Sequence, residues 1–271
     1  MITLLTWELV LARRDDEGFR VATPEVRAAY VSLVREMAEA APAGRVPPDA
    51  GTRAAALGLT VTVEGTVAWL MEPPDDLHGA GVLALRLGPL PAELVLQAPH
   101  PTSDRHTGPV AAALFDAGDI RAAFISTVHR DAAPGSDTAR APESWLTAAT
   151  IALAEALPDP LFVQLHGHSP ETSEADAVVS EGSARMPPAE LYTAARRIAQ
   201  ALGVADVRTG EEVRALAARG NAQGLVIGDR ARFLHVEMSA TVRERLAGDA
   251  ALRASLGDAL LLQAARKPIL P

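Results

Sequence analysis

Four short apolar runs of this sequence each end in side chains that can bind a metal, move a proton or hold an anion. Imidazole nitrogen and carboxylate oxygen are ligands of catalytic zinc, which keeps one coordination position for water. A carboxylate that is not a ligand can take a proton from that water, and an arginine can bind an oxyanion or a carboxylate. The side chains concerned are His100, Asp104, His106, His129, Arg130, His166, His168 and Glu237.

The first two runs end in loops that carry histidine next to charged residues. "APHPTSDRHTG" contains His100 and Asp104, and "STVHRD" contains His129, Arg130 and Asp131. Taken alone, a histidine in such a loop is more often a surface residue than a ligand. An exposed ion pair of the second kind contributes less than about 1 kcal/mol. Neither segment alone therefore indicates a site.

The third and fourth runs carry their polar residues inside the apolar pattern. In "QLHGHS", His166 and His168 lie on the same side of a continuing strand, and Gly167 permits close approach of a ligand or a neighbouring backbone. In "HVEMS", Glu237 interrupts an apolar strand, where an ionised carboxylate is costly unless paired. A glutamate that faces solvent from an edge strand is the alternative. The coincidence of all four strand ends favours one shared site.

Short β-rich runs alternate with helical patterns along most of the chain. This alternation predicts an α/β fold with a mostly parallel or mixed central sheet and helices on both faces. In such sheets, ligands bind beyond the carboxyl ends of the strands, which is where the polar residues fall. The expected strands are 92–100, 120–130, 160–169 and 230–244, and the expected helices are 107–117, 143–156, 187–202, 210–218 and 240–265.

The N-terminal third is expected to form a β extension of the same domain. Residues 2–11 and 58–74 are predicted as strands, and 81–88 as the hairpin partner of the second. Residues 23–41 are predicted as a helix that Thr23 caps and that has proline at its first position. We therefore expect a single domain over 1–271, with the extension and hairpin in 1–91 and a catalytic core in 92–271.

Composition excludes several classes of partner and site. The 271 residues are 48% hydrophobic, enough for a packed core, and the formal net charge of −9 argues against nucleic acid or an anionic membrane as partner. No cysteine is present, so a metal must bind to His, Asp or Glu. No run reaches the roughly 18 apolar residues that span a bilayer, and no signal peptide is recognised. A cytoplasmic location is therefore weakly expected.

The order of these motifs resembles the zinc carboxypeptidases and their relatives, the N-formylglutamate amidohydrolases and aspartoacylase-like deacylases. "FVQLHGHS" is similar to the "DLHGHS"-type segment of cytosolic carboxypeptidases, whose first histidine binds zinc, which implies His166 as a ligand. "FLHVEMS" resembles the strand with the general-base glutamate, which implies Glu237. "VHRD" and "QAPHPTSD" stand where the family has its substrate-binding arginine and its first histidine and acidic ligand. The resemblance covers about residues 92–240.

The resemblance implies a Zn²⁺ ion held by His100, Asp104 and His166, with Arg130 at an oxyanion or a substrate carboxylate. The family's first motif is H-x-x-E, whereas here the acid is an aspartate one residue later, so His106 remains an alternative ligand. The family's asparagine before the arginine is replaced by His129.

The implied activity is hydrolysis of an amide or peptide bond, with Glu237 as the general base and His168 and His129 orienting ligands or the leaving group. A small N-acyl amino acid or a peptide with a free carboxylate is the expected substrate. A non-catalytic binding protein on a degenerate scaffold and a metal-dependent phosphoesterase are the alternatives. The polar segment 169–188 is expected to form a loop over the site or an ordinary surface excursion.

Overall fold

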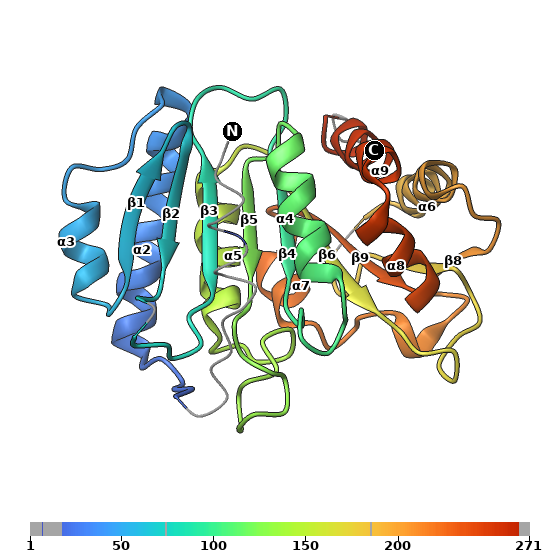
Figure 1. Ribbon diagram of the computed structural model, residues 1–271, viewed down its shortest axis with the longest axis horizontal. Coiled ribbons are helices and arrows are strands. Elements are labelled where there is room, and N and C mark those ends of the chain that lie inside the picture. Colours follow the sequence, from blue (N-terminus) through green and yellow to red (C-terminus); the bar gives the residue numbers. More distant parts are fainter. Residues whose placement is uncertain (1–6, 8–17, 74, 185, 266–271) are drawn as a thin grey trace.

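The computed structural model describes residues 7, 18–73, 75–184 and 186–265, and one nine-stranded mixed sheet forms its centre. The strands are β1 (Thr60–Glu64), β2 (Val67–Met71), β3 (Val82–Arg86), β4 (Leu94–Ala98), β5 (Ala122–Ile125), β6 (Leu161–Gly167), β7 (Ala177–Ser180), β8 (Val207–Thr209) and β9 (Arg232–Met238). Their order across the sheet is β1-β2-β3-β5-β4-β6-β9-β7-β8 (Figure 1).

The four central strands, β5, β4, β6 and β9, run parallel to one another. The flanking strands β1, β2 and β3 pair antiparallel, and β7 pairs antiparallel with β9. Because β4, β6 and β9 run in the same direction, their carboxyl ends lie at the same edge of the sheet. The predicted α/β fold with a mixed sheet is confirmed.

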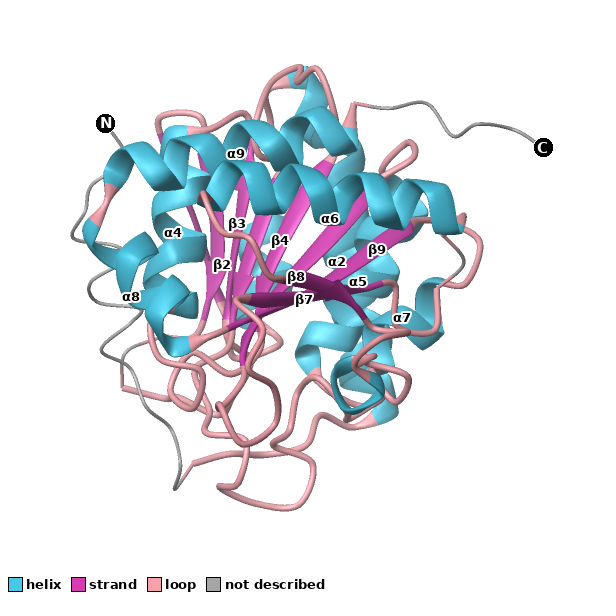
Figure 2. Cartoon of the chain, turned by 90° about the vertical axis from the view of Figure 1, so that its right-hand side faces the viewer, coloured by secondary structure: helices cyan, strands magenta, loops and turns pink. Residues whose placement is uncertain are grey.

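Helices cover both faces of the sheet, as Figures 1 and 2 show. One face packs against α4 (Thr107–Ala117), α6 (Pro188–Leu202), α8 (Ala240–Gly248) and α9 (Ala250–Ala264), and the other against α2 (Pro24–Ala40), α3 (Ala50–Ala55), α5 (Trp145–Ala156) and α7 (Ala222–Ile227). Two short 3₁₀ helices are η1 (Ala41–Ala43) and η2 (Arg214–Leu216). None of the helices in the described ranges combines the length and the apolar character that crossing a bilayer requires.

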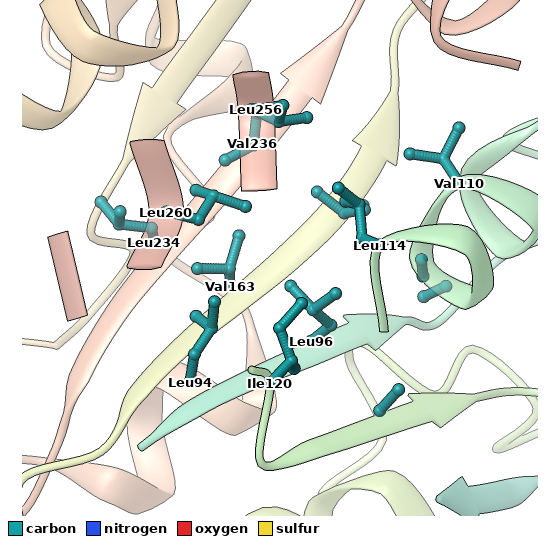
Figure 3. Close-up of a cluster of buried hydrophobic side chains, with 14 of the residues drawn as sticks. Leu94, Leu96, Val110, Leu114, Ile120, Val163, Leu234, Val236, Leu256 and Leu260 are labelled. Carbon is teal, nitrogen blue, oxygen red and sulfur yellow. The ribbon is translucent and has the colours of Figure 1, made fainter. Parts of the chain in front are cut away.

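Alternate residues of the central strands separate the two hydrophobic layers. Leu96, Val163 and Val236 belong to the layer under α4 and α9 (Figure 3). Phe162 and Phe233 belong to the opposite layer, under α2, α5 and α7. Full burial of such side chains stabilises the fold by about 1.5–3 kcal/mol each. On this second face the apolar pattern stops before the strands end, and polar residues take its place.

Several local predictions hold because their sequence signals are local. Thr23 caps α2 by accepting a hydrogen bond from the N–H of Val26, with Pro24 at the first position. The expected helices 107–117, 143–156 and 187–202 correspond to α4, α5 and α6. The strand predicted over 2–11 falls outside the described residues except for Trp7, which packs edge-on against Trp69 with ring centroids 4.9 Å apart.

Other local predictions are corrected by the structure. Residues 58–74 form the hairpin β1–β2, because Gly65 (φ 58°) turns the chain. Only η2 is helical within 210–218, because Glu212 accepts hydrogen bonds from Thr209 and closes a turn there. The helix expected over 240–265 is split at Asp249, which has an extended backbone and caps α9. The segment expected as a loop over 169–188 contains β7.

Candidate active site

Three predicted ligands come together at the carboxyl ends of β4 and β6. The Nδ1 atom of His166 lies 3.0 Å from Oδ2 of Asp104, and Nδ1 of His100 lies 3.8 Å from the same oxygen. The rings of His100 and His166 have centroids 5.1 Å apart. Candidate ligand atoms of all three residues lie within 4.8 Å of one another, so one ion can touch all three.

Strand register and one tight turn produce this arrangement. His166 on β6 is paired with Glu237 on β9, and two residues earlier Gln164 is paired with His235. Because side chains alternate along a strand, these four residues share one face of the sheet. Asp104 reaches the same place because its N–H donates to the carbonyl of His100 at 2.7 Å, which folds the loop after β4 back on itself.

The donor set fits a divalent cation. Nε2 of His100 lies 2.9 Å from Oδ1 of Asp137, so in the neutral ring this nitrogen is the donor and the lone pair of Nδ1 faces Asp104. That Nδ1 atom is buried and has no hydrogen-bond partner among the described residues. A buried polar atom without a partner is costly, and a cation between Nδ1 and the carboxylate would remove this cost. Two imidazoles and one carboxylate are a ligand set that Zn²⁺ accepts.

The charges of the three residues are coupled to one another. Burial raises the pKa of Asp104, but its interactions with His100 and His166 outweigh burial and hold its pKa far below the usual range. Burial lowers the pKa of His100, but Asp104 and Asp137 more than offset this and raise it. Asp104 is therefore ionised at neutral pH, and a positive charge beside it, on a histidine ring or on a bound cation, stabilises the carboxylate.

Glu237 lies next to this cluster and is largely buried. Its side chain is 11% exposed, and burial raises its pKa above the usual value for a glutamate. One carboxylate oxygen, Oε2, is buried and has no hydrogen-bond partner in the described part of the chain, and the other lies 3.7 Å from Nε2 of His235. Glu237, His235 and His166 form a second group with ligand atoms within 4.8 Å of one another. A carboxylate in this position is suited to accept a proton.

The cluster forms part of the wall of an open cavity of about 440 Å³. His100, His166, His235 and Glu237 line it together with the loop that follows β6. Arginines line other parts of its wall, and they are Arg130, Arg140, Arg214 and Arg219. The protein as a whole is acidic, so this concentration of guanidinium groups is a local feature.

The remaining predicted residues differ in their distance from the cluster. Arg130 lines the cavity and bonds to Asp137 at 3.2 Å. His168 also lines it, with burial as the main cause of a lowered pKa. His129 bonds to Ser103 at 3.2 Å and lies outside the described cavity lining. His106 begins α4 in a left-handed conformation (φ 75°) and belongs to neither ligand group among the described residues.

Three residues that contact the candidate ligands or Glu237 were not predicted from the sequence. Asp137 orients His100, Gln164 bonds to Nε2 of His166 at 3.0 Å, and His235 is buried beside Glu237. The period-two spacing of Gln164 from His166 and of His235 from Glu237 was the available signal for two of them. Nothing in the local sequence indicates that Asp137 reaches His100.

Gly167 has a specific packing role between the two histidines. A Cβ atom at this position would lie 2.4 Å from Cζ of Arg243. The Arg243 guanidinium donates to the carbonyls of Met238 and Arg105, so it ties the end of β9 to the loop that carries Asp104. The sequence predicted close approach of a ligand or a neighbouring backbone at this glycine, whereas the group that approaches it is the side chain of Arg243.

Comparison with known proteins finds solved structures at low identity and low TM-score. No protein-family model matches the chain, and no curated protein matches it. N-formylglutamate amidohydrolase from Ralstonia eutropha is 14% identical with a TM-score of 0.43, covering 64% of this chain and 96% of that one. A protein assigned as a carboxypeptidase from Burkholderia mallei is 15% identical with a TM-score of 0.46, covering 91% and 69%.

A third structure, a bacteriophage poly-gamma-glutamate hydrolase, is 10% identical with a TM-score of 0.40 and covers 64% of this chain and 83% of that one. The structures found thus include the kinds of hydrolase that the motifs resemble, at low identity. The chemistry of this chain is argued below from its own residues.

Proposed function

We propose that this protein is a zinc-dependent hydrolase of amide or peptide bonds. One observation carries the proposal: ligand atoms of His100, Asp104 and His166 converge on one point, next to the buried carboxylate of Glu237, in the wall of an open cavity. A Zn²⁺ ion bound there would lower the pKa of a water molecule and polarise a substrate carbonyl.

Glu237 is proposed as the general base. Burial raises the pKa of Glu237, which makes this carboxylate a stronger base than one in water. Its Oε2 atom has no partner within the described protein, so it is available to accept a proton from the attacking water. The same carboxyl group can then donate that proton to the leaving nitrogen.

A substrate with a free carboxylate fits the arginines of the cavity. Arg130 is partly neutralised by Asp137, at 3.2 Å. Arg214 and Arg219 are exposed, and neither forms an ion pair with a carboxylate among the described residues. Because a guanidinium binds a carboxylate through two parallel hydrogen bonds, these residues support small N-acyl amino acids or peptides as substrates.

Variants of Glu237 and His100 distinguish the proposed general base from the proposed metal ligands. Glu237→Gln should abolish turnover of an N-acyl amino acid while zinc content, measured by elemental analysis, stays near one per chain. His100→Ala should lose both zinc and turnover. Glu39→Gln, on the exposed side of α2, is the matched control and should change neither.

A panel of N-acyl amino acids, peptides, their C-terminal amides and phosphoesters identifies the bond. Faster hydrolysis of free acids than of the matching amides is expected from the arginines. Full activity in Glu237→Gln would remove Glu237 as the base. Absence of zinc from wild-type protein after incubation and dialysis would favour a binding protein, and turnover of phosphoesters alone would favour a phosphoesterase.

A further inference from the structure

A chain of buried amide side chains lies directly beneath the ligand cluster. Gln97 on β4, Gln164 on β6, and Gln223 and Asn221 at the start of α7 are each no more than 4% exposed. They occupy the face of the sheet that is otherwise filled by the apolar layer under α2, α5 and α7. Burying an amide is costly unless its hydrogen bonds are made, so this polar chain requires an explanation.

Asn221 fixes one end of the Gln164 amide. Oδ1 of Asn221 accepts a hydrogen bond from the backbone N–H of Gly224 at 2.9 Å, as the cap of α7. The other terminal atom of Asn221 must then be Nδ2, which can only donate. It lies 2.6 Å from Gln164, so the Gln164 atom that it meets must be the acceptor, Oε1.

Gln223 fixes the opposite end independently. One terminal atom of Gln223 lies 2.9 Å from the backbone carbonyl of Thr138, which can only accept, so this atom is Nε2. Its remaining atom, Oε1, faces Gln164 at 2.9 Å and requires a donor there, which is Nε2 of Gln164. Both anchors therefore give the Gln164 amide the same orientation.

This orientation determines which ring nitrogen of His166 carries a proton. Oε1 of Gln164 lies 3.0 Å from Nε2 of His166, so Nε2 must be the donor. The lone pair of a neutral His166 ring is then on Nδ1, which faces Oδ2 of Asp104 at 3.0 Å. An imidazole that protonates Nδ1 instead would present no lone pair to a cation at this point.

We propose that Gln164 is a positioning residue that holds His166 as the Nε2–H tautomer and directs its Nδ1 lone pair at the metal. The inference rests on the proposed function, because it assigns a role toward the zinc ion of that site. The orientation is transmitted from two backbone groups, the N–H of Gly224 and the carbonyl of Thr138, through Asn221 and Gln223.

Three variants separate positioning from a merely structural role. Gln164→Met removes the acceptor that faces His166. Gln97→Met removes a buried partner of Gln164 but no contact to a ligand, since among the described residues the Gln97 side chain bonds only to Gln164 and Thr150. Gln164→Glu keeps an acceptor toward His166 but loses both donors toward Gln97 and Gln223.

Zinc affinity, measured by competition with a chromophoric chelator, is the first readout. Loss of a group that orients a ligand typically weakens metal binding by about 10–100-fold. Gln164→Met should show a loss of this size, whereas Gln97→Met should stay within about threefold of wild type. Gln164→Glu should bind zinc at least as tightly as wild type, although the loss of both donors lowers its stability in urea. If Gln164→Met does not fold, the comparison of Gln164→Glu with wild type still decides.

The second readout is independent of turnover. In Co²⁺-substituted protein, the exchangeable ring N–H protons of His100 and His166 should both give hyperfine-shifted NMR signals, because each donates to an oxygen atom of a neighbouring side chain. The signal of His166 should disappear in Gln164→Met and persist in Gln97→Met.

Equal zinc affinities in Gln164→Met and Gln97→Met, with both N–H signals retained, would overturn the inference, as would weakened zinc binding in Gln164→Glu. These outcomes leave the proposed function intact. That function fails separately, if wild-type protein binds no zinc.

Discussion

Replacing Gly167 by alanine tests why a glycine separates His166 from His168. The new Cβ would lie 2.4 Å from Cζ and 2.5 Å from Nε of Arg243, closer than two such atoms can approach. Gly167 does not have a positive φ, so alanine causes no backbone strain by itself. The guanidinium of Arg243, which is only 8% exposed, must therefore move.

The expected loss of stability follows from the hydrogen bonds that Arg243 would lose. Its Nε atom donates to the carbonyl of Met238 at 3.2 Å, and Nη1 donates to that of Arg105 at 2.7 Å. A hydrogen bond from a charged donor contributes about 1.5–3 kcal/mol, and the flexible side chain regains part of this by hydration. We expect Gly167→Ala to lower the free energy of unfolding by about 2–4 kcal/mol.

Urea unfolding followed by circular dichroism measures this change, and a double-mutant cycle identifies its origin. In an Arg243→Ala background the same alanine should cost less than about 0.5 kcal/mol, because nothing is left to displace. Gly51→Ala, which would meet nothing within 4 Å, is the control and should be neutral or slightly stabilising. An equal cost of Gly167→Ala in both backgrounds would refute the reasoning.

Two further predictions concern buried groups away from the site. Burial, with Glu72 nearby, raises the pKa of Tyr30, so above a pH of about 10 the unfolded chain releases a proton that the folded chain keeps. The free energy of unfolding should therefore fall there by up to about 1.4 kcal/mol per pH unit. Tyr30→Phe should flatten this pH dependence in urea titrations at pH 8 and 11. Arg121→Met should lower the free energy of unfolding by about 3–5 kcal/mol, because it leaves the buried carboxylate of Glu93, bonded to Arg121 at 2.6 Å, without its cation. Adding Glu93→Gln should recover much of this stability. No recovery in the double variant would contradict the pairing.

Much of the site could be predicted because its signals are local. Alternation of strands and helices places the polar residues of a parallel sheet at one edge, so His100, Asp104 and His166 were expected together, and the structure brings them together. The period of two along a strand places Gln164 beside His166 and His235 beside Glu237 on one face.

The rest depended on contacts between distant segments. Asp137 reaches His100 across 37 positions of sequence, and the orientation of Gln164 depends on Asn221 and Gln223, more than 50 positions away. Neither their spacing nor their residue type indicates these partners.

By itself, the sequence determined the local periods, the helix caps and the residue types available at each strand end. Only the tertiary structure decided which strands became neighbours and which face of β6 contacts the buried amide side chains. It also places the Arg243 side chain where a side chain at position 167 would lie. The physical reason is that dihedral preferences act over a few residues, whereas strand order and buried hydrogen bonds are chosen by the packing of the whole chain.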